Sequence, residues 1–131
     1  MTTEEAQITN STSVMMTTVA GDEYAIGYVS LGSLDESVKA LKIDGAEATA
    51  ENIKNDTYKV SRPFNIVTQK GAENEVAKDF ISYIMSKEGQ QVVSDNGYIG
   101  DDSAAAYAGS KPAGKIVVGG SSSVSPVMEK T

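Results

Sequence analysis

The chain has 131 residues, of which 40% are hydrophobic and 22% charged, as expected for a globular domain rather than a disordered segment. Its net charge of −7 argues against nucleic acid and anionic membrane as partners. It has no cysteine and no histidine, which excludes disulfides, thiolate metal sites, cysteine nucleophiles and Ser-His-Asp triads. We therefore expect a binding protein rather than an enzyme, with no cofactor and no metal ion.

The first third of the chain predicts a helix followed by strands. Residues 1–20 are polar and have no basic leading region, so we expect no signal peptide here. Several possible N-caps at residues 10–13 precede an apolar run at 14–19, which predicts a short helix. Residues 25–31 predict a buried strand. Residues 38–43 alternate between apolar and polar and predict a half-exposed strand.

The middle of the chain predicts a short helix, a strand and a long helix. Thr49 can cap a helix over residues 50–54. Residues 58–69 read as a strand that Pro63 interrupts. Residues 73–86 give the clearest helix, because their apolar side chains recur every three or four residues and form one face.

A second short helix is predicted at residues 90–94, begun by Gly89 and ended by Asn96-Gly97. Residues 100–114 are small and polar, which is typical of a linker.

The last segment predicts a strand, a glycine turn and the start of a helix. Residues 115–118 form the strand, and Gly120, Ser121, Ser122 and Ser123 follow as a hydroxyl-rich turn, here named the serine loop (residues 120–123). A helix N-terminus has unpaired N–H groups and a positive dipole end, so this pattern is typical of an oxyanion site. The alternative is a serine-capped helix with no ligand.

Other polar and apolar groups have simpler explanations. Asp101 and Asp102, with Glu4, Glu5 or Asp95, fit no calcium-loop spacing and are expected to be solvated. Residues 10–13 could act as a second anion loop, although helix capping explains them too. The remaining groups are expected to pack or to be solvated: Tyr58, Tyr83, Tyr98, Met15 and Met16 to pack, and Lys70 and Lys115 to be solvated.

Four blocks of sequence resemble one family. They are AIGYVSLG at 25–32, AENIKNDTY with SRPF at 50–64, FISYIMSKEGQ at 80–90 and NGYI at 96–99. Together they resemble the C-terminal portion of the phosphate-binding proteins of bacterial ABC phosphate transporters, over about residues 4–99.

Residues 115–130 resemble the N-terminal strand and phosphate loop of the same family. The family motif Gly-Ser-Thr-Ser-Val-x-Pro stands here as GSSSVSP at 120–126. The resemblance implies that Ser122 and Ser123 give hydroxyls and N–H groups to phosphate, with Ser121 and Gly120 as weaker candidates.

The chain also departs from the family. The family's beginning follows its end, and its middle is missing, including an aspartate acceptor and an Arg-x-x-Gly-Ser-Gly-Thr loop. Arg62 is the one arginine, and it belongs to the SRPF block. A junction of two tandem modules, an engineered permutation and a split protein all fit this order, and the native-looking linker favours the first.

The resemblance implies an α/β fold. We expect a lobe like that of type II periplasmic binding proteins, with a mixed sheet and helices on both faces. Residues 1–99 and 115–131 would complete one lobe, joined by a linker at 100–114. The helix at 73–86 should pack on the sheet that contains residues 116–118.

The resemblance further implies a solute-binding component of an ABC importer. Such a protein is extracellular or periplasmic, binds inorganic phosphate, and works with a membrane permease in the parent protein. The alternative is an assembly module, in which a lobe that lacks strands is completed by exchange with a second copy to form a homodimer.

Overall fold

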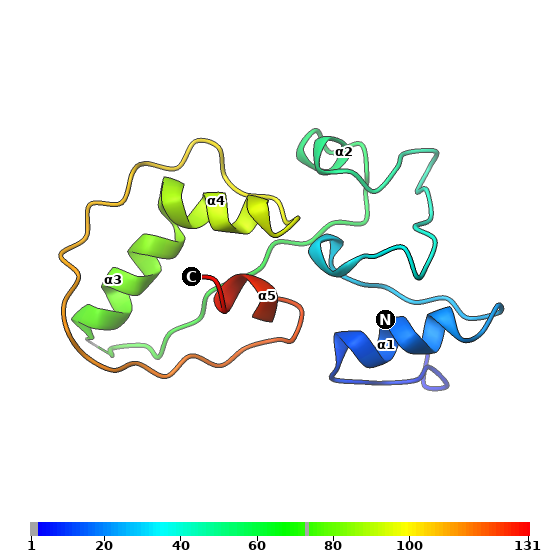
Figure 1. The fold of residues 1–131 in the computed structure, drawn as a ribbon, viewed down its shortest axis with the longest axis horizontal. Coiled ribbons are helices and arrows are strands. Elements are labelled where there is room, and N and C mark those ends of the chain that lie inside the picture. Colours follow the sequence, from blue (N-terminus) through cyan, green and yellow to red (C-terminus); the bar gives the residue numbers. More distant parts are fainter. Residues whose placement is uncertain (1–2, 73) are drawn as a thin grey trace.

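The computed structural model describes residues 3–72 and 74–131. Within them the structure has five α-helices and one 3₁₀ turn (Figure 1): α1 (Thr12–Ala20), η1 (Leu31–Ser33), α2 (Ala50–Lys54), α3 (Glu75–Ile84), α4 (Lys87–Asp95) and α5 (Ser125–Met128). The pair α3 and α4 lies on one side of the molecule, and α1 and α2 lie on the other. The short α5 lies between the two groups, near the C-terminus. No described helix is long and apolar enough to cross a bilayer.

Side-chain caps fix where the helices begin. The Ser11 hydroxyl accepts the Val14 N–H at the start of α1, and the Thr49 hydroxyl accepts the Asn52 N–H at the start of α2. Each cap satisfies one of the N–H groups that a helix leaves unpaired at its first turn. The predicted helices at 14–19 and 50–54 are confirmed, and α1 extends two residues further toward the N-terminus.

The pair α3–α4 was predicted only in part. The Asn74 amide oxygen caps α3 by accepting the Ala77 N–H, and Glu73, where we placed the helix start, lies outside the described residues. Helix α4 begins at Lys87 rather than at residue 90, with Ser86 as its N-cap. The helix was predicted, but its start was placed too late, because Gly89 does not begin the helix: it lies inside α4, close to the end of α3.

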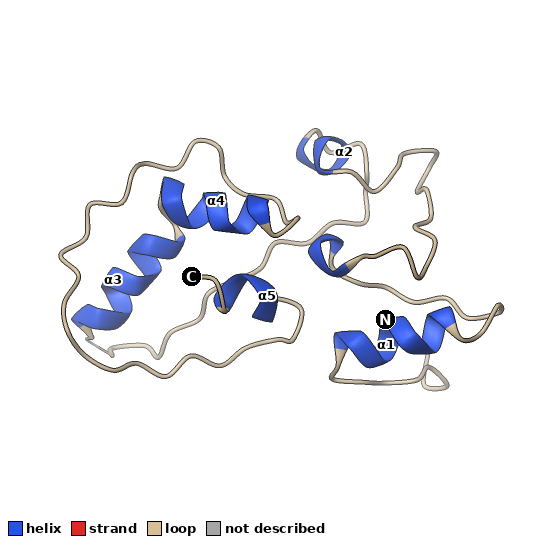
Figure 2. Ribbon diagram, in the orientation of Figure 1, coloured by secondary structure: helices blue, strands red, loops and turns tan. Residues whose placement is uncertain are grey.

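The predicted mixed sheet does not form (Figure 2). Among the described residues the structure contains no strand, and its one β-bridge joins Ile43 to Ala46 across the Asp44-Gly45 turn. The segments predicted as strands, at 25–31, 38–43, 58–69 and 115–118, are mostly irregular and lack ladder partners. A ladder needs a second strand about 4.8 Å away. These segments have the strand composition, but no two of them form a ladder among the described residues.

The unpaired segments leave much apolar surface in solvent. The accessible surface is 10170 Å², about one and a half times the area expected for a compact monomer of this mass. Among the described residues only four apolar ones are buried, namely Met16, Ala46, Tyr98 and Val127. By contrast, Val67 is 87% exposed and Val117 is 92% exposed. The described part of the chain therefore buries little of its apolar surface.

Residues 100–114 run as an arm around the outside of α3 and α4 and lead back to α5 (Figure 1). Backbone groups of the arm bond to the helices: the Lys87 N–H donates to the Ala105 carbonyl at 2.8 Å, and the Tyr107 N–H donates to the Glu88 carboxylate at 2.7 Å. The Asp79 carboxylate accepts the Tyr107 hydroxyl and, at 3.0 Å, the Ser110 N–H. The predicted linker composition is therefore compatible with a fixed path.

The bond between Glu88 and the arm predicts a pH dependence. The Tyr107 N–H holds the pKa of the Glu88 carboxyl below its ordinary value of 4.5. A depressed folded-state pKa means that the contact contributes fully above 4.5 and is lost as pH falls through the lowered value. We expect the amide resonance of Tyr107 to shift with a midpoint below 4.5 during an NMR titration from pH 7 to pH 3. Glu88→Gln should remove this shift, and a midpoint at or above 4.5 would contradict the contact.

Candidate anion-binding site

The serine loop lies against the start of α1. The Ser122 hydroxyl donates to the Asn10 carbonyl at 3.2 Å and lies 3.0 Å from the Thr12 hydroxyl. These contacts join segments 110 or more residues apart in the sequence. The structure therefore brings together the two hydroxyl-rich segments that the sequence suggested as anion loops, residues 10–13 and 120–123.

Some donors of the serine loop are engaged within the chain and others are free. The Ser123 N–H donates to the Ser121 hydroxyl at 3.2 Å, and the Val124 N–H donates to the Ser121 carbonyl at 3.0 Å. The Ser122 N–H and the Ser123 hydroxyl have no hydrogen-bond partner among the described residues. The N–H groups of Gly120 and Ser121 are also without a partner among those residues, so each residue of the loop has a free donor.

Helix α5 contributes less than the sequence suggested. It has only four residues, Pro126 has no N–H, and the N–H groups of Val127 and Met128 both donate to the Val124 carbonyl. So short a helix has few aligned peptide dipoles. Within the described residues α5 therefore adds little to the loop, and an anion would be held by individual N–H and hydroxyl donors.

Tyr98 is a residue near the loop that sequence reasoning treated only as a packing residue. Its hydroxyl donates to the Ser123 carbonyl at 2.5 Å, and its ring meets Phe64 edge-on with centroids 5.9 Å apart. The packing prediction for Tyr98 and for Tyr83, which meets Tyr107 edge-on, is confirmed. The NGYI block could have pointed to the loop contact only through knowledge of the fold, since the two residues are 25 positions apart.

The acidic residues outside the loop are paired or solvated. The Ser103 hydroxyl and N–H donate to Asp101 and hold the pKa of its carboxyl below the usual range. The Asp102 carboxylate pairs with Lys54 at 2.5 Å. Among the described residues no group of three or more acidic side chains is placed to hold a metal ion.

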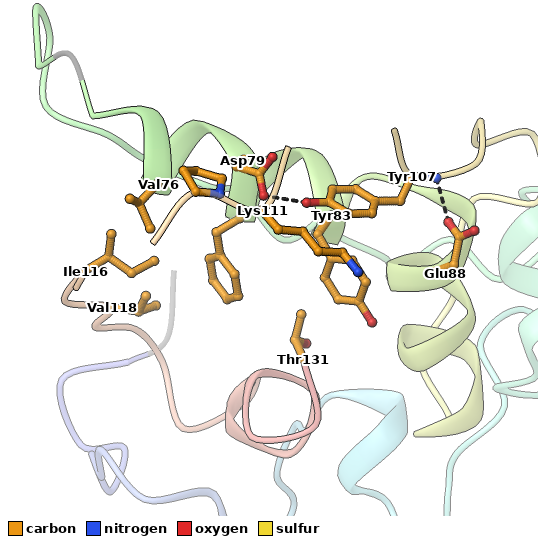
Figure 3. Close-up of a pocket in the computed structure, with 11 residues that line it drawn as sticks. Val76, Asp79, Tyr83, Glu88, Tyr107, Lys111, Ile116, Val118 and Thr131 are labelled. Atoms are coloured by element: carbon orange, nitrogen blue, oxygen red, sulfur yellow. Dashed lines mark hydrogen bonds between the residues drawn. The ribbon is translucent and has the colours of Figure 1, made fainter. Parts of the chain in front are cut away.

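A separate hollow of about 750 Å³ lies between α3 and the arm (Figure 3). Its walls include Val76, Phe80 and Tyr83 of α3 on one side and Ile116 and Val118 on the other. The serine loop does not line it. We predicted that α3 packs on a sheet containing residues 116–118; the two face each other, but across a cavity, because the sheet is not formed.

The comparisons with known proteins place the chain in a family. Residues 1–88 match the family model described as PBP superfamily domain, which is about two thirds of the chain. This chain belongs to the PBP superfamily. The match ends before the arm and the serine loop, so the superfamily assignment rests on the part of the chain that contains α1, α2 and α3.

Two curated relatives of this PBP superfamily chain have the same printed name. The chain is 62% identical over 129 residues to "Phosphate-binding protein PstS 2" of Streptococcus agalactiae serotype V, and 46% identical over 130 residues to the protein of that name from Streptococcus pneumoniae serotype 4. Each match covers 98% of this chain and 44% of the relative. The chain thus spans less than half the length of these relatives, whose names describe binding rather than a reaction.

Two solved structures are similar to this PBP superfamily chain. The first is a phosphate-binding protein of a phosphate ABC transporter from Streptococcus pneumoniae, with 46% identity and a TM-score of 0.71 over 98% of this chain and 50% of that one. The second is a putative phosphate ABC transporter substrate-binding protein with bound phosphate from Clostridium perfringens, with 43% identity and a TM-score of 0.70 over 76% of this chain and 41% of that one. The backbone path is therefore that of phosphate-binding proteins, although the sheet is not formed here.

Proposed function

We propose that this chain is a segment of the solute-binding component of an ABC importer and binds inorganic phosphate without covalent chemistry. The serine loop would hold the anion, with Ser122 and Ser123 as the main donors and Ser121 and Gly120 beside them. The observation that carries the proposal is a loop with a free donor on each residue, among them the Ser122 N–H and the Ser123 hydroxyl, held in place by Asn10 and Thr12. The relatives support phosphate as the anion, because one is named a phosphate-binding protein and another is described with bound phosphate.

The small number of hydrogen-bond donors in the loop limits the phosphate affinity that this chain can have on its own. A neutral hydrogen bond contributes roughly 0.5–1.5 kcal/mol net. Two or three such bonds give about 4 kcal/mol at best, which corresponds to a millimolar dissociation constant. Phosphate must also displace the bond from Ser122 to Asn10 if it uses the Ser122 hydroxyl. We therefore expect weak binding.

Selectivity should be weak for a related reason. Phosphate carries a proton at neutral pH and sulfate does not, so discrimination needs an acceptor such as a carboxylate. The serine loop contains no acidic residue. We expect the chain to bind phosphate and sulfate with similar constants.

Isothermal titration of the chain with phosphate and with sulfate tests the proposal. We expect millimolar constants for both anions, and weaker phosphate binding by the Ser122→Ala, Ser123→Ala double variant, which lacks both hydroxyls but keeps the backbone N–H groups, with unchanged helix content. Ser103→Ala is the matched control, because it removes a serine hydroxyl that bonds to Asp101 instead. Unaltered phosphate binding by the double variant would reject the serine loop as the site, and a micromolar phosphate-selective constant would mean that further ligands exist.

The order of the blocks fits a natural arrangement of the relatives. The match to the Streptococcus agalactiae relative covers 98% of this chain, so it includes both residues 1–99 and the serine loop. This supports a natural order over an engineered permutation. We propose that residues 1–99 and 115–131 belong to one lobe joined by the arm, in a protein that acts outside the cytoplasm with a membrane permease.

A second candidate is assembly with another copy of the chain. The excess of exposed surface and the unpaired segments at 58–69 and 115–118 favour it, since such segments can be completed by strand exchange. Light scattering on the titration samples separates the two. A stable dimer without phosphate binding would favour exchange, and a monomer that binds phosphate would favour the first proposal.

A further inference from the structure

We infer that Tyr98 is a positioning residue for the serine loop, and that its hydroxyl sets the orientation of the phosphate donors. This inference rests on the proposed function. It concerns a residue outside the loop that the sequence motif does not contain.

The ring of Tyr98 is held on several sides. Tyr98 follows the turn at Gly97, whose φ of +79° lies in the left-handed region that favours glycine. The residue is 7% exposed and its ring meets Phe64 edge-on. A Cβ on Gly32 would lie 2.1 Å from the ring, so only glycine allows η1 to approach this closely. The packing around the ring therefore fixes its position independently of the hydroxyl.

The hydroxyl of Tyr98 links η1 to the serine loop. It donates to the Ser123 carbonyl at 2.5 Å and lies 3.2 Å from the Ser33 hydroxyl. A phenol has one proton to donate. Because Tyr98 gives that proton to Ser123, the Ser33 hydroxyl is the donor in the second contact. The order of donation is thus Ser33 to Tyr98 to Ser123.

This series of hydrogen bonds fixes the orientation of the proposed phosphate donors. Holding the Ser123 carbonyl fixes the peptide plane between Ser123 and Val124, and with it the backbone of the residue whose hydroxyl is free. A second constraint comes from the other side, where Ser122 bonds to Asn10. The loop is held at Ser122 by α1 and at Ser123 by Tyr98. Preorganised donors bind more tightly because less conformational entropy is lost on binding.

Tyr98→Phe tests the inference because it keeps the ring and removes only the hydroxyl. We expect phosphate binding to weaken about 3- to 10-fold, as for one lost hydrogen bond. The Val124 amide should exchange faster with solvent, and the melting temperature should change little. Tyr107→Phe is the matched control: it removes the tyrosine hydroxyl that bonds to Asp79 on α3, and should alter neither phosphate affinity nor Val124 exchange.

The outcomes separate this inference from the proposed function. Weaker phosphate binding with faster Val124 exchange in Tyr98→Phe alone supports it. Unchanged affinity in Tyr98→Phe, when the parent chain binds phosphate, overturns it and leaves the proposed function intact. If the parent chain binds no phosphate, the proposed function fails, and the exchange rate of the Val124 amide is the remaining test of loop positioning. Faster exchange in Tyr98→Phe supports the positioning role of Tyr98, and equal rates overturn it.

Discussion

Replacing Gly89 by alanine is expected to separate α4 from α3 and to lower the free energy of unfolding by about 3 kcal/mol. A Cβ at this position would lie 2.2 Å from the Tyr83 carbonyl oxygen, 2.6 Å from the Ile84 carbonyl oxygen and 2.7 Å from the Ile84 Cα. All three are backbone atoms of the last turn of α3, which cannot move aside without breaking that turn. Gly89 is also buried, so the new methyl group has no route into solvent.

Urea unfolding followed by circular dichroism measures this effect as a fall in the midpoint. Gly119→Ala is the matched control, because a Cβ there meets nothing within 4 Å. It should change the midpoint little. Equal midpoints for Gly89→Ala and Gly119→Ala would show that the close approach of α4 to α3 does not hold in solution.

The largest change in phosphate affinity is expected between a full-length relative and the part of it that matches this chain. The Streptococcus agalactiae relative can be compared with its own matching segment, which is 44% of its length. We expect the full-length protein to bind phosphate at least about 10³-fold more tightly, a difference of about 4 kcal/mol. A dehydrated anion needs nearly every lone pair matched, and the serine loop supplies only a few donors.

Titration of both forms under one ionic strength gives the ratio directly. The segment with Ser122→Ala and Ser123→Ala at its matching positions is the control for nonspecific binding. Equal constants for the segment and the full-length protein would mean that the serine loop carries nearly all of the binding energy, which would contradict the count of donors made above.

The helices could be predicted well where local chemistry determines them. Thr49 caps α2 and fixes its start at residue 50, since the cap and the helix lie within five residues of each other. Helix α4 was predicted too short, because a glycine in sequence gives no sign that it stands next to the carbonyls of Tyr83 and Ile84. The close contact of Gly89 with these carbonyls depends on the angle between α3 and α4, which the glycine alone does not reveal.

The sequence alone could not predict whether the sheet would form. Residues 115–118 have the composition of a buried strand, and Val117 is nevertheless 92% exposed. Apolar composition predicts that a segment will be covered in the complete protein, but it does not say which chain segment provides the cover. Phe80 and Ile116 likewise line an open hollow rather than a packed interface between helix and sheet.

The sequence motif selects Ser122 and Ser123 as the proposed donors but gives no sign of the residues that support the loop. In the structure, Ser122 contacts Asn10 and Thr12 of the other hydroxyl-rich segment, residues 10–13. Tyr98 was recognised only as a packing residue. A single hydroxyl bonded to a backbone carbonyl leaves no trace in composition, periodicity or spacing.

The order of the segments also bears on synthesis at the ribosome. Asn10, Thr12 and Tyr98 leave the ribosome before Ser122 and Ser123, and the contacts of α3 with α4 are local, so both helices can form while the arm is still being made. Ser122 and Ser123 therefore emerge when their partners Asn10, Thr12 and Tyr98 have already been made. A chain with the opposite order would present these serines before any of those partners had been synthesised.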